Sequence, residues 1–126
     1  MRLNGAAAIV TGGGRGIGRR ICLAFAVEGA RVVVAAPTHA EIDAAVQEIE
    51  SVGGTGLAVP VDVADEQSVS SLVTRTLAEY GRVDILVNNA AISHRRGPVA
   101  EMDSLTWDSV LAVNLRGVFL CSLGAW

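Results

Sequence analysis

The order of structural elements can be read from residues 6–18, AAAIVTGGGRGIG. The five apolar residues 6–10 predict a short buried strand, and the glycines from Gly12 to Gly18 predict a tight turn directly after it. Ile17, Ile21 and Phe25 then recur every four residues, which is the spacing of one face of a helix. A strand, a glycine-rich turn and a helix are therefore expected in immediate succession.

The same alternation continues along the rest of the chain. Helical stripes separate further short apolar runs, and Thr38 and Glu41 have the spacing of a helix capping box. The three later strands are predicted at residues 32–36, 57–61 and 85–87. A last helix, apolar nearly all round, begins near Asp103. Alternating strands and helices predict an α/β fold with a Rossmann-type, doubly wound parallel sheet.

This topology predicts where a ligand binds. The doubly wound strand order is 3-2-1-4, which places the third strand at an edge of the sheet. Pro60 agrees with this position, because proline has no N–H group to donate to a neighbouring strand. The turn after the first strand and Asn88-Asn89 after the fourth then meet at one crevice. Ligands of open α/β sheets bind in such a crevice, outside the carboxyl ends of the strands.

Composition limits the classes of protein to which the chain can belong. A length of 126 residues predicts one domain, and 51% hydrophobic residues exclude a disordered tail. No uninterrupted apolar run is as long as a membrane span, and the N-terminus lacks a secretory pattern, so a cytoplasmic chain without membrane contact is expected. A net charge of −3 argues against nucleic acid as a partner. Cys22 and Cys121, far apart in apolar helical patterns, predict buried thiols rather than a metal site.

The glycine-rich turn predicts an anion-binding site. Gly12, Gly16 and Gly18 allow the backbone to approach a pyrophosphate, and amides at the start of the helix face the negative charge. A nucleoside-triphosphate loop is excluded because Arg19-Arg20 stands where lysine and a hydroxyl residue are required. We interpret the turn as a dinucleotide-binding loop.

The end of the second strand bears on the choice of cofactor. NAD-binding sites place an acidic residue there, whereas this chain has Ala36-Pro37-Thr38. Arg15 could pair with a 2′-phosphate, so NADP is favoured and NAD remains an alternative. The other interpretation of Arg15 is an ordinary solvated surface cation.

Four motifs together resemble a known family. They are Thr11-Gly-x-x-x-Gly-x-Gly18, Asp62-Val63, Asn88-Asn89-Ala90-Ala91 and Asn114 within Val113-Asn114-Leu115. In this order they resemble the short-chain dehydrogenase/reductases, and the amino-acid sequence of the first loop is similar to that of 3-oxoacyl-carrier-protein reductases. The chain departs from the family at Ala91, where glycine is more usual.

The resemblance implies a set of site residues. Asn114 would belong to the proton relay of the family, and a cofactor would contact the loop and the ends of strands two to four. The expected cofactor-binding residues are Gly12, Gly14, Arg15, Gly16, Ile17, Gly18, Thr38, Asp62, Val63, Asn89 and Ala90. The alternatives are that Asp62 only caps the next helix and that Asn88 only satisfies backbone groups at the strand end.

The resemblance also implies what these residues lack. The family carries out hydride transfer between NAD(P)(H) and a carbonyl or alcohol substrate, with a serine and a Tyr-x-x-x-Lys pair later in the chain. Here the only tyrosine is Tyr80, with Asp84 four residues on, and there is no lysine. We therefore expect residues 1–126 to be the N-terminal cofactor-binding part of an oxidoreductase, lacking the C-terminal half, and to form a homo-oligomer through the last helix. The alternative is a non-catalytic dinucleotide-binding or interaction module that a partner completes.

Overall fold

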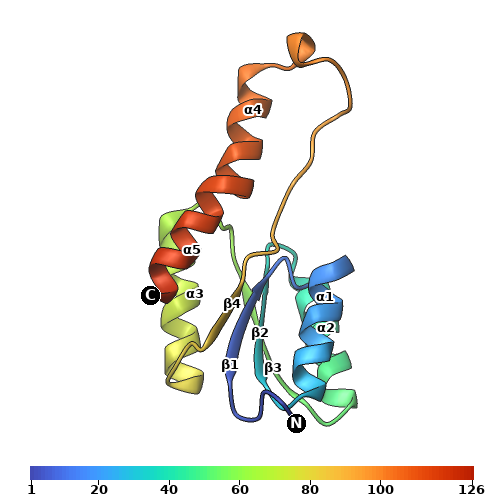
Figure 1. The fold of residues 1–126 in the computed structure, drawn as a ribbon, viewed down its shortest axis with the longest axis vertical. Helices are drawn as coiled ribbons and strands as arrows, with labels where there is room; N and C mark the ends of the chain where they lie inside the picture. The colour runs from blue at the N-terminus through green and yellow to red at the C-terminus, as the bar shows by residue number, and fades with distance from the viewer.

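One parallel sheet with helices on both faces forms the centre of the molecule (Figure 1). The computed structural model describes all residues, 1–126. In chain order the elements are β1 (Ala7–Thr11), α1 (Gly16–Val27), β2 (Arg31–Ala36), α2 (His39–Ser51), β3 (Thr55–Pro60), α3 (Glu66–Tyr80), β4 (Ile85–Val87), a 3₁₀ turn (Val99–Glu101), α4 (Ser104–Leu111), a π-helical turn (Ala112–Arg116) and α5 (Gly117–Ala125).

The strand order is β3-β2-β1-β4 with parallel pairing throughout, which confirms the predicted Rossmann-type topology. Ala8 of β1 pairs with Val32 on one side and with Ile85 on the other. Pro60 lies on the edge strand β3, as predicted. However, β3 begins at Thr55, two residues before its predicted start, because Thr55 and Gly56 pair with the first residues of β2 although neither is strongly apolar.

Two apolar clusters hold the helices on the sheet. Helices α1 and α2 cover one face, where Cys22 and Ile42 meet Val32 and Val34, and α3 and α5 cover the other, where Leu72 and Leu120 lie in one cluster with strand residues (Figure 1). All residues of β1 are buried, as expected for a strand covered on both faces. Burying one such Val or Ile side chain contributes about 1.5–3 kcal/mol. The two layers fix the carboxyl ends of β1, β2 and β4 next to one another.

Side-chain capping is present at the start of α3 but absent at the start of α2. Asp65 caps α3 by accepting from the Gln67 amide, and Gly81 ends that helix with φ +75°. Thr38 is the N-cap residue of α2, but its side chain makes no capping hydrogen bond. The predicted capping box is therefore wrong, and the Glu41 side chain is left without its expected role at the helix start.

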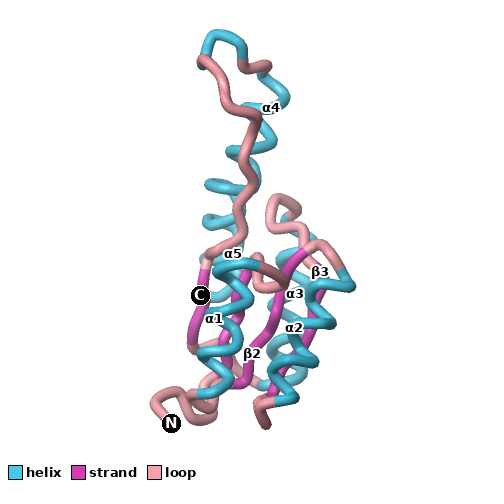
Figure 2. The backbone as a smooth tube through the Cα atoms, turned by 90° about the vertical axis from the view of Figure 1, so that its right-hand side faces the viewer, coloured by secondary structure: helices cyan, strands magenta, loops and turns pink.

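The C-terminal segment extends away from the sheet (Figure 2). The loop after β4 and helix α4 project beyond the ends of the strands, and α5 returns to pack on α3. Residues 104–125 form a helical segment that is long and apolar enough to cross a membrane by length and composition alone. The prediction based on uninterrupted apolar runs did not find it, because Asp108, Asn114 and Arg116 interrupt the apolar sequence. Core helices of soluble proteins meet the same criterion.

Candidate functional site

A cavity of about 490 Å³ opens at the carboxyl ends of the strands, at the predicted crevice. Its volume is in the range of small-molecule and cofactor sites. Five segments of the chain form its wall. They contribute Gly12, Gly14, Arg15, Gly16 and Ile17 from the first loop, Ala36, Pro37, Thr38 and Glu41 from the end of β2 and the start of α2, Val61, Asp62 and Val63 after β3, Asn89, Ala90, Ala91 and Ile92 after β4, and Val113 from the π-helical turn.

The first loop requires glycine for two separate reasons. Gly12 and Gly16 have φ values of +63° and +56°, a region that other residues rarely adopt. At Gly18 a Cβ atom would collide with the carbonyl oxygen of Gly12 and with the Asn89 amide. Nothing lies within 4 Å of a Cβ built at Gly16. The loop is therefore held tightly on its inner side and is open on its outer side.

The amides of this loop are free. No backbone or side-chain hydrogen bond uses the N–H groups from Gly14 to Gly18, and the first bond of α1 is donated by Arg19 to the carbonyl of Arg15. Arg15, the N-cap residue, has no side-chain capping bond, and the first turn carries no acidic residue. Unpaired amides at a helix N-terminus attract anions through their partial positive charge. This end of α1 is thus arranged to bind a phosphate or another anion.

Thr11 and Asn89 connect the loop to the end of β4. The buried Thr11 hydroxyl donates to the Val87 carbonyl at 3.3 Å and accepts from the amides of Asn89 and Ala90, both at 3.1 Å. The Asn89 side chain donates to the Gly12 carbonyl at 3.1 Å. These bonds hold the two halves of the crevice together. Asn88 does not satisfy strand-end backbone groups, since its amide donates to the Ser122 hydroxyl at 3.3 Å.

Asn114 fixes the loop that continues from β4. Its side chain accepts from the Ile92 amide at 2.8 Å and donates to the Ile92 carbonyl at 2.9 Å. It lies in the π-helical turn, a feature that occurs often at functional sites. The polar amide in an apolar helix has thus found its partner in the backbone, and it holds Ile92 at the cavity wall.

The charged groups of the cavity come from three elements. Arg15 is exposed and forms no ion pair, while Glu41 lies over Gly14, with Oε2 3.3 Å from the position of a Cβ there. Asp62 does not cap α3, a role that Asp65 takes; it accepts instead from the Ala64 amide at 3.0 Å. The cavity therefore carries one cation and two carboxylates. The side chain of Val63 is 2.7 Å from a Cβ built at Gly117, so α5 packs closely behind this part of the wall.

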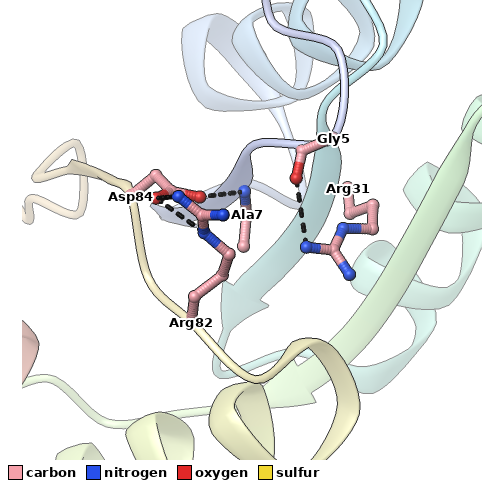
Figure 3. A network of polar contacts seen from close by, with 5 residues as sticks. All are labelled: Gly5, Ala7, Arg31, Arg82 and Asp84. Atoms are coloured by element: carbon pink, nitrogen blue, oxygen red, sulfur yellow. Dashed lines mark hydrogen bonds and ion pairs between the residues drawn. The ribbon is translucent and has the colours of Figure 1, made fainter.

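The opposite end of the sheet has paired polar groups (Figure 3). Asp84 accepts from the Ala7 amide at 2.9 Å and from the Arg82 guanidinium at 2.6 and 2.8 Å, and Arg31 donates to the Gly5 carbonyl at 3.0 Å. The bond from Arg82 is the main cause that lowers the pKa of the Asp84 carboxyl below its usual value. The guanidinium of Arg31 stacks on the ring of Tyr80, 4.9 Å from its centre.

Tyr80 lies too far from the cavity to act on a ligand bound there. Its partner Arg31 begins β2, whereas Ala36, at the other end of that strand, lines the cavity. Burial is the main cause that raises the pKa of the Tyr80 hydroxyl. The single tyrosine is thus part of the packing at the far end of the sheet.

The structure brings most of the predicted site residues together. All of them line the cavity except Gly18, which packs closely against the Gly12 carbonyl, and Asn114, whose side chain is bonded to the backbone of Ile92. Sequence reasoning missed Glu41, which it assigned to a capping box. It also missed Ile92 and Val113, for which the sequence offered only apolar character.

The remaining candidate groups lie elsewhere. A polar hollow of about 440 Å³ is formed on the projecting loop and α4 by residues 94–98, 101–103 and 106, and none of the predicted site residues lines it. Cys22 and Cys121 are buried and unpaired, as predicted. Burial raises the pKa of Cys22 to about 12, so its thiol is inert at neutral pH. No group of three or more His, Cys, Asp or Glu side chains is arranged to hold a metal ion.

Comparison with known proteins identifies the family. The family model described as short chain dehydrogenase matches residues 6–125. The chain belongs to the short-chain dehydrogenase family. The match covers both the glycine-rich loop and the helix with Asn114, as the resemblance of the motifs implied.

Similar sequences are members of the same short-chain dehydrogenase family. The chain is 40% identical over 121 residues to the short chain dehydrogenase/reductase dpmpG of Macrophomina phaseolina, covering 95% of this chain and 69% of the relative. It is 38% identical over 119 residues to the 3-oxoacyl-[acyl-carrier-protein] reductase FabG of Thermotoga maritima, covering 94% and 48%. The chain thus spans about half the length of the second relative.

Solved structures of the family have the same fold. A metagenomic short-chain oxidoreductase in complex with NADP has a TM-score of 0.94 and 35% identity, covering 98% of this chain and 56% of that one. A mutant of a short-chain dehydrogenase/reductase of Serratia marcescens has a TM-score of 0.93 and 36% identity, covering 99% and 51%.

Proposed function

We propose that residues 1–126 are one Rossmann domain, the cofactor-binding part of an NADP(H)-dependent oxidoreductase acting on a carbonyl or alcohol. The observation that carries the proposal is the row of free amides from Gly14 to Gly18, of which those of residues 14–17 line the cavity. A dinucleotide fits this site, because the cradle exists only where Gly12 and Gly18 lack a Cβ. When bound, the nicotinamide supplies the hydride.

Each group of residues has a part in this proposal. The amides of the first loop would hold the pyrophosphate, Arg15 would pair with the 2′-phosphate, and Thr38, Gly14 and Ile17 would face the adenosine ribose. Asp62 and Val63 would flank the adenine, and Asn89 and Ala90 would line the path to the nicotinamide ribose. The support for NADP over NAD is the unpaired Arg15 and the apolar end of β2.

The proton transfer of the family needs groups outside these residues. Residues 1–126 hold no lysine, and Tyr80 lies at the far end of the sheet, so we expect no dehydrogenase turnover from them alone. In the whole protein Asn114 is a positioning residue, since its side chain is committed to Ile92. The substrate would be a small carbonyl or alcohol compound in the cytoplasm.

We propose further that α5 contributes to a homo-oligomer. Its outer face exposes Phe119 by 59% and Leu123 by 60%, and the preceding Leu115 is exposed by 65%. Contiguous apolar surface of this kind commonly marks a protein interface. Sedimentation of the wild type against Phe119→Glu tests this, since the variant should sediment as a smaller species; equal sedimentation would contradict it.

The test of cofactor binding is a fluorescence titration with NADPH. Gly16→Val forces a β-branched residue to φ +56° and should weaken NADPH at least tenfold, because the amides of the loop turn away from the pyrophosphate. Gly53→Val is the matched control, since Gly53 has φ +80°, equally open surroundings and no part in the cavity. Both variants should lose about 1–2 kcal/mol of stability, but only the first should lose NADPH. Equal NADPH affinity of the two variants would contradict the proposal.

A further inference from the structure

Glu41 brings a carboxylate into the cavity from α2, next to the glycine-rich loop. It lines the same cavity as Ala36, Pro37 and Thr38, although it lies on α2. Its Cβ is 2.9 Å and its Oε2 is 3.3 Å from the position that a Cβ on Gly14 would occupy. The helix therefore sets this carboxylate directly on the glycine-rich loop, in the cavity that Arg15 also lines.

The Glu41 carboxylate has no partner in the protein. It forms no hydrogen bond to the start of α2, because the capping box is absent, and the ion pairs of the chain are Arg19–Glu48 and Arg82–Asp84. Arg19 on the adjacent helix is thus already occupied by Glu48 at 2.7 Å. A half-buried carboxylate with free lone pairs can accept hydrogen bonds from a ligand.

The position of this carboxylate matters for a nucleotide. Rossmann domains that bind NAD hold the ribose 2′-hydroxyl with an acidic residue at the end of the second strand. Here that strand ends in alanine, and Glu41 in the first turn of α2 supplies a carboxylate instead. A carboxylate at this place accepts from a ribose hydroxyl and repels a 2′-phosphate, which carries about two negative charges at neutral pH.

We infer that Glu41 is a specificity-determining residue that opposes Arg15 in the choice between NADP(H) and NAD(H). Arg15 favours the 2′-phosphate, and Glu41 reduces that preference and supports the unphosphorylated ribose. The inference rests on the proposed function, because it needs the adenosine ribose to lie in this cavity. It predicts that the two nucleotides bind with more similar affinities than Arg15 alone would give.

The experiment compares dissociation constants for NADPH and NADH in the 126-residue chain. Glu41→Gln should tighten NADPH by about three- to tenfold, as expected for removal of a partly exposed like charge, and should leave NADH equal or weaker. Arg15→Gln should weaken NADPH by a similar factor and change NADH little. The gain of Glu41→Gln should shrink as salt rises, since salt screens charges at this exposure.

Asp43→Asn is the matched control. Asp43 lies two residues along α2, is exposed and does not line the cavity, so its variant makes the same change of net charge outside the site. Its ratio of NADPH to NADH affinity should equal that of the wild type. Thermal unfolding of all variants checks that they fold, and Glu41→Ala provides a second neutral variant.

The possible outcomes distinguish a failure of the inference about Glu41 from a failure of the proposed nucleotide-binding function. A rise in the ratio of NADPH to NADH affinity for Glu41→Gln, and not for Asp43→Asn, supports the inference. An unchanged ratio, or a rise of equal size in both variants, would overturn it while leaving nucleotide binding intact. Failure of the folded wild type to bind either nucleotide would overturn the proposed function, and the role of Glu41 with it.

Discussion

The two ends of the sheet use their polar groups in opposite ways. At the amino ends of the strands, Asp84 is bonded to the Ala7 amide and to Arg82, and Arg31 is bonded to Gly5 (Figure 3). At the carboxyl ends, the amides from Gly14 to Gly18 have no partner, and neither has the carboxylate of Glu41. Most polar groups are thus paired at the amino ends, where the buried Nε of Arg31 lacks a partner, whereas free groups gather at the carboxyl ends.

This difference separates stability from binding. Paired groups lower the free energy of the folded chain, whereas free groups at the mouth of a cavity are available to a ligand. Thr11 and Asn89 are the exception at the open end, because their bonds hold the free groups in place. Changes at the amino ends should therefore alter folding alone, and changes around Thr11 should alter both folding and binding.

The largest effect on stability is expected from Thr11→Val. The substitution preserves shape but removes the acceptor of the half-buried Ala90 amide. The Asn89 amide loses one of its two acceptors, because it also donates to the Val87 carbonyl at 3.1 Å. An orphaned amide costs about 1–3 kcal/mol. Urea denaturation should show a loss of about 1–3 kcal/mol, and the NADPH affinity should fall as well. The matched control is Thr76→Val, because Thr76 is equally buried but only donates to the Leu72 carbonyl within its own helix. Equal losses for the two variants would refute the role of Thr11 as a connection.

A smaller effect is expected from Asn114→Leu. The variant loses both bonds to the backbone of Ile92, so the loop after β4 should open locally at a cost of about 1 kcal/mol. Hydrogen exchange should become faster at the Ile92 amide and stay unchanged at Ile9 in β1. Asn88→Leu, which loses only a bond to Ser122, should leave Ile92 protected. Unchanged exchange at Ile92 in Asn114→Leu would show that other contacts hold this loop.

The smallest effect is expected from Asp84→Asn, at the paired end. The folded-state pKa of Asp84 is lowered, so the ionised carboxylate stabilises the chain above the usual aspartate pKa of about 3.9. The advantage of the wild type over Asp84→Asn should be full at neutral pH and should disappear as the pH falls through the lowered value. Urea denaturation between pH 7 and pH 2 measures it, and NADPH affinity at pH 7 should stay unchanged. A stability difference independent of pH would contradict the assigned cause, as would an unchanged pH dependence in Arg82→Gln.

The fold could be predicted almost completely from the sequence. Short apolar runs mark the strands and the glycines at 12–18 mark the turn, and these are local signals that the topology then combines. The predicted start of β3 was two residues late, because Thr55 and Gly56 are not strongly apolar. They belong to the strand because they pair with Arg31 and Val32 at the start of β2.

Site residues could be predicted only where they belong to a recognisable sequence motif. The loop and Asn89 stand in recognisable patterns, but the place of Glu41 depends on how α2 packs against Gly14, and no local pattern records that contact. The partner of Asn114 is a backbone group 22 residues away, reached through a π-helical turn. Such tertiary arrangements follow from the assembled layers, so the sequence indicated that Asn114 needed a partner without indicating which one.

The most direct test of the central claim is an amide chemical-shift titration of the ¹⁵N-labelled chain with NADPH. We expect the largest changes at the amides from Gly14 to Gly18, with smaller ones at Asn89 to Ile92 and none around Asp84. Changes centred on the projecting loop at His94–Arg96, with the glycine-rich loop unaffected, would contradict it.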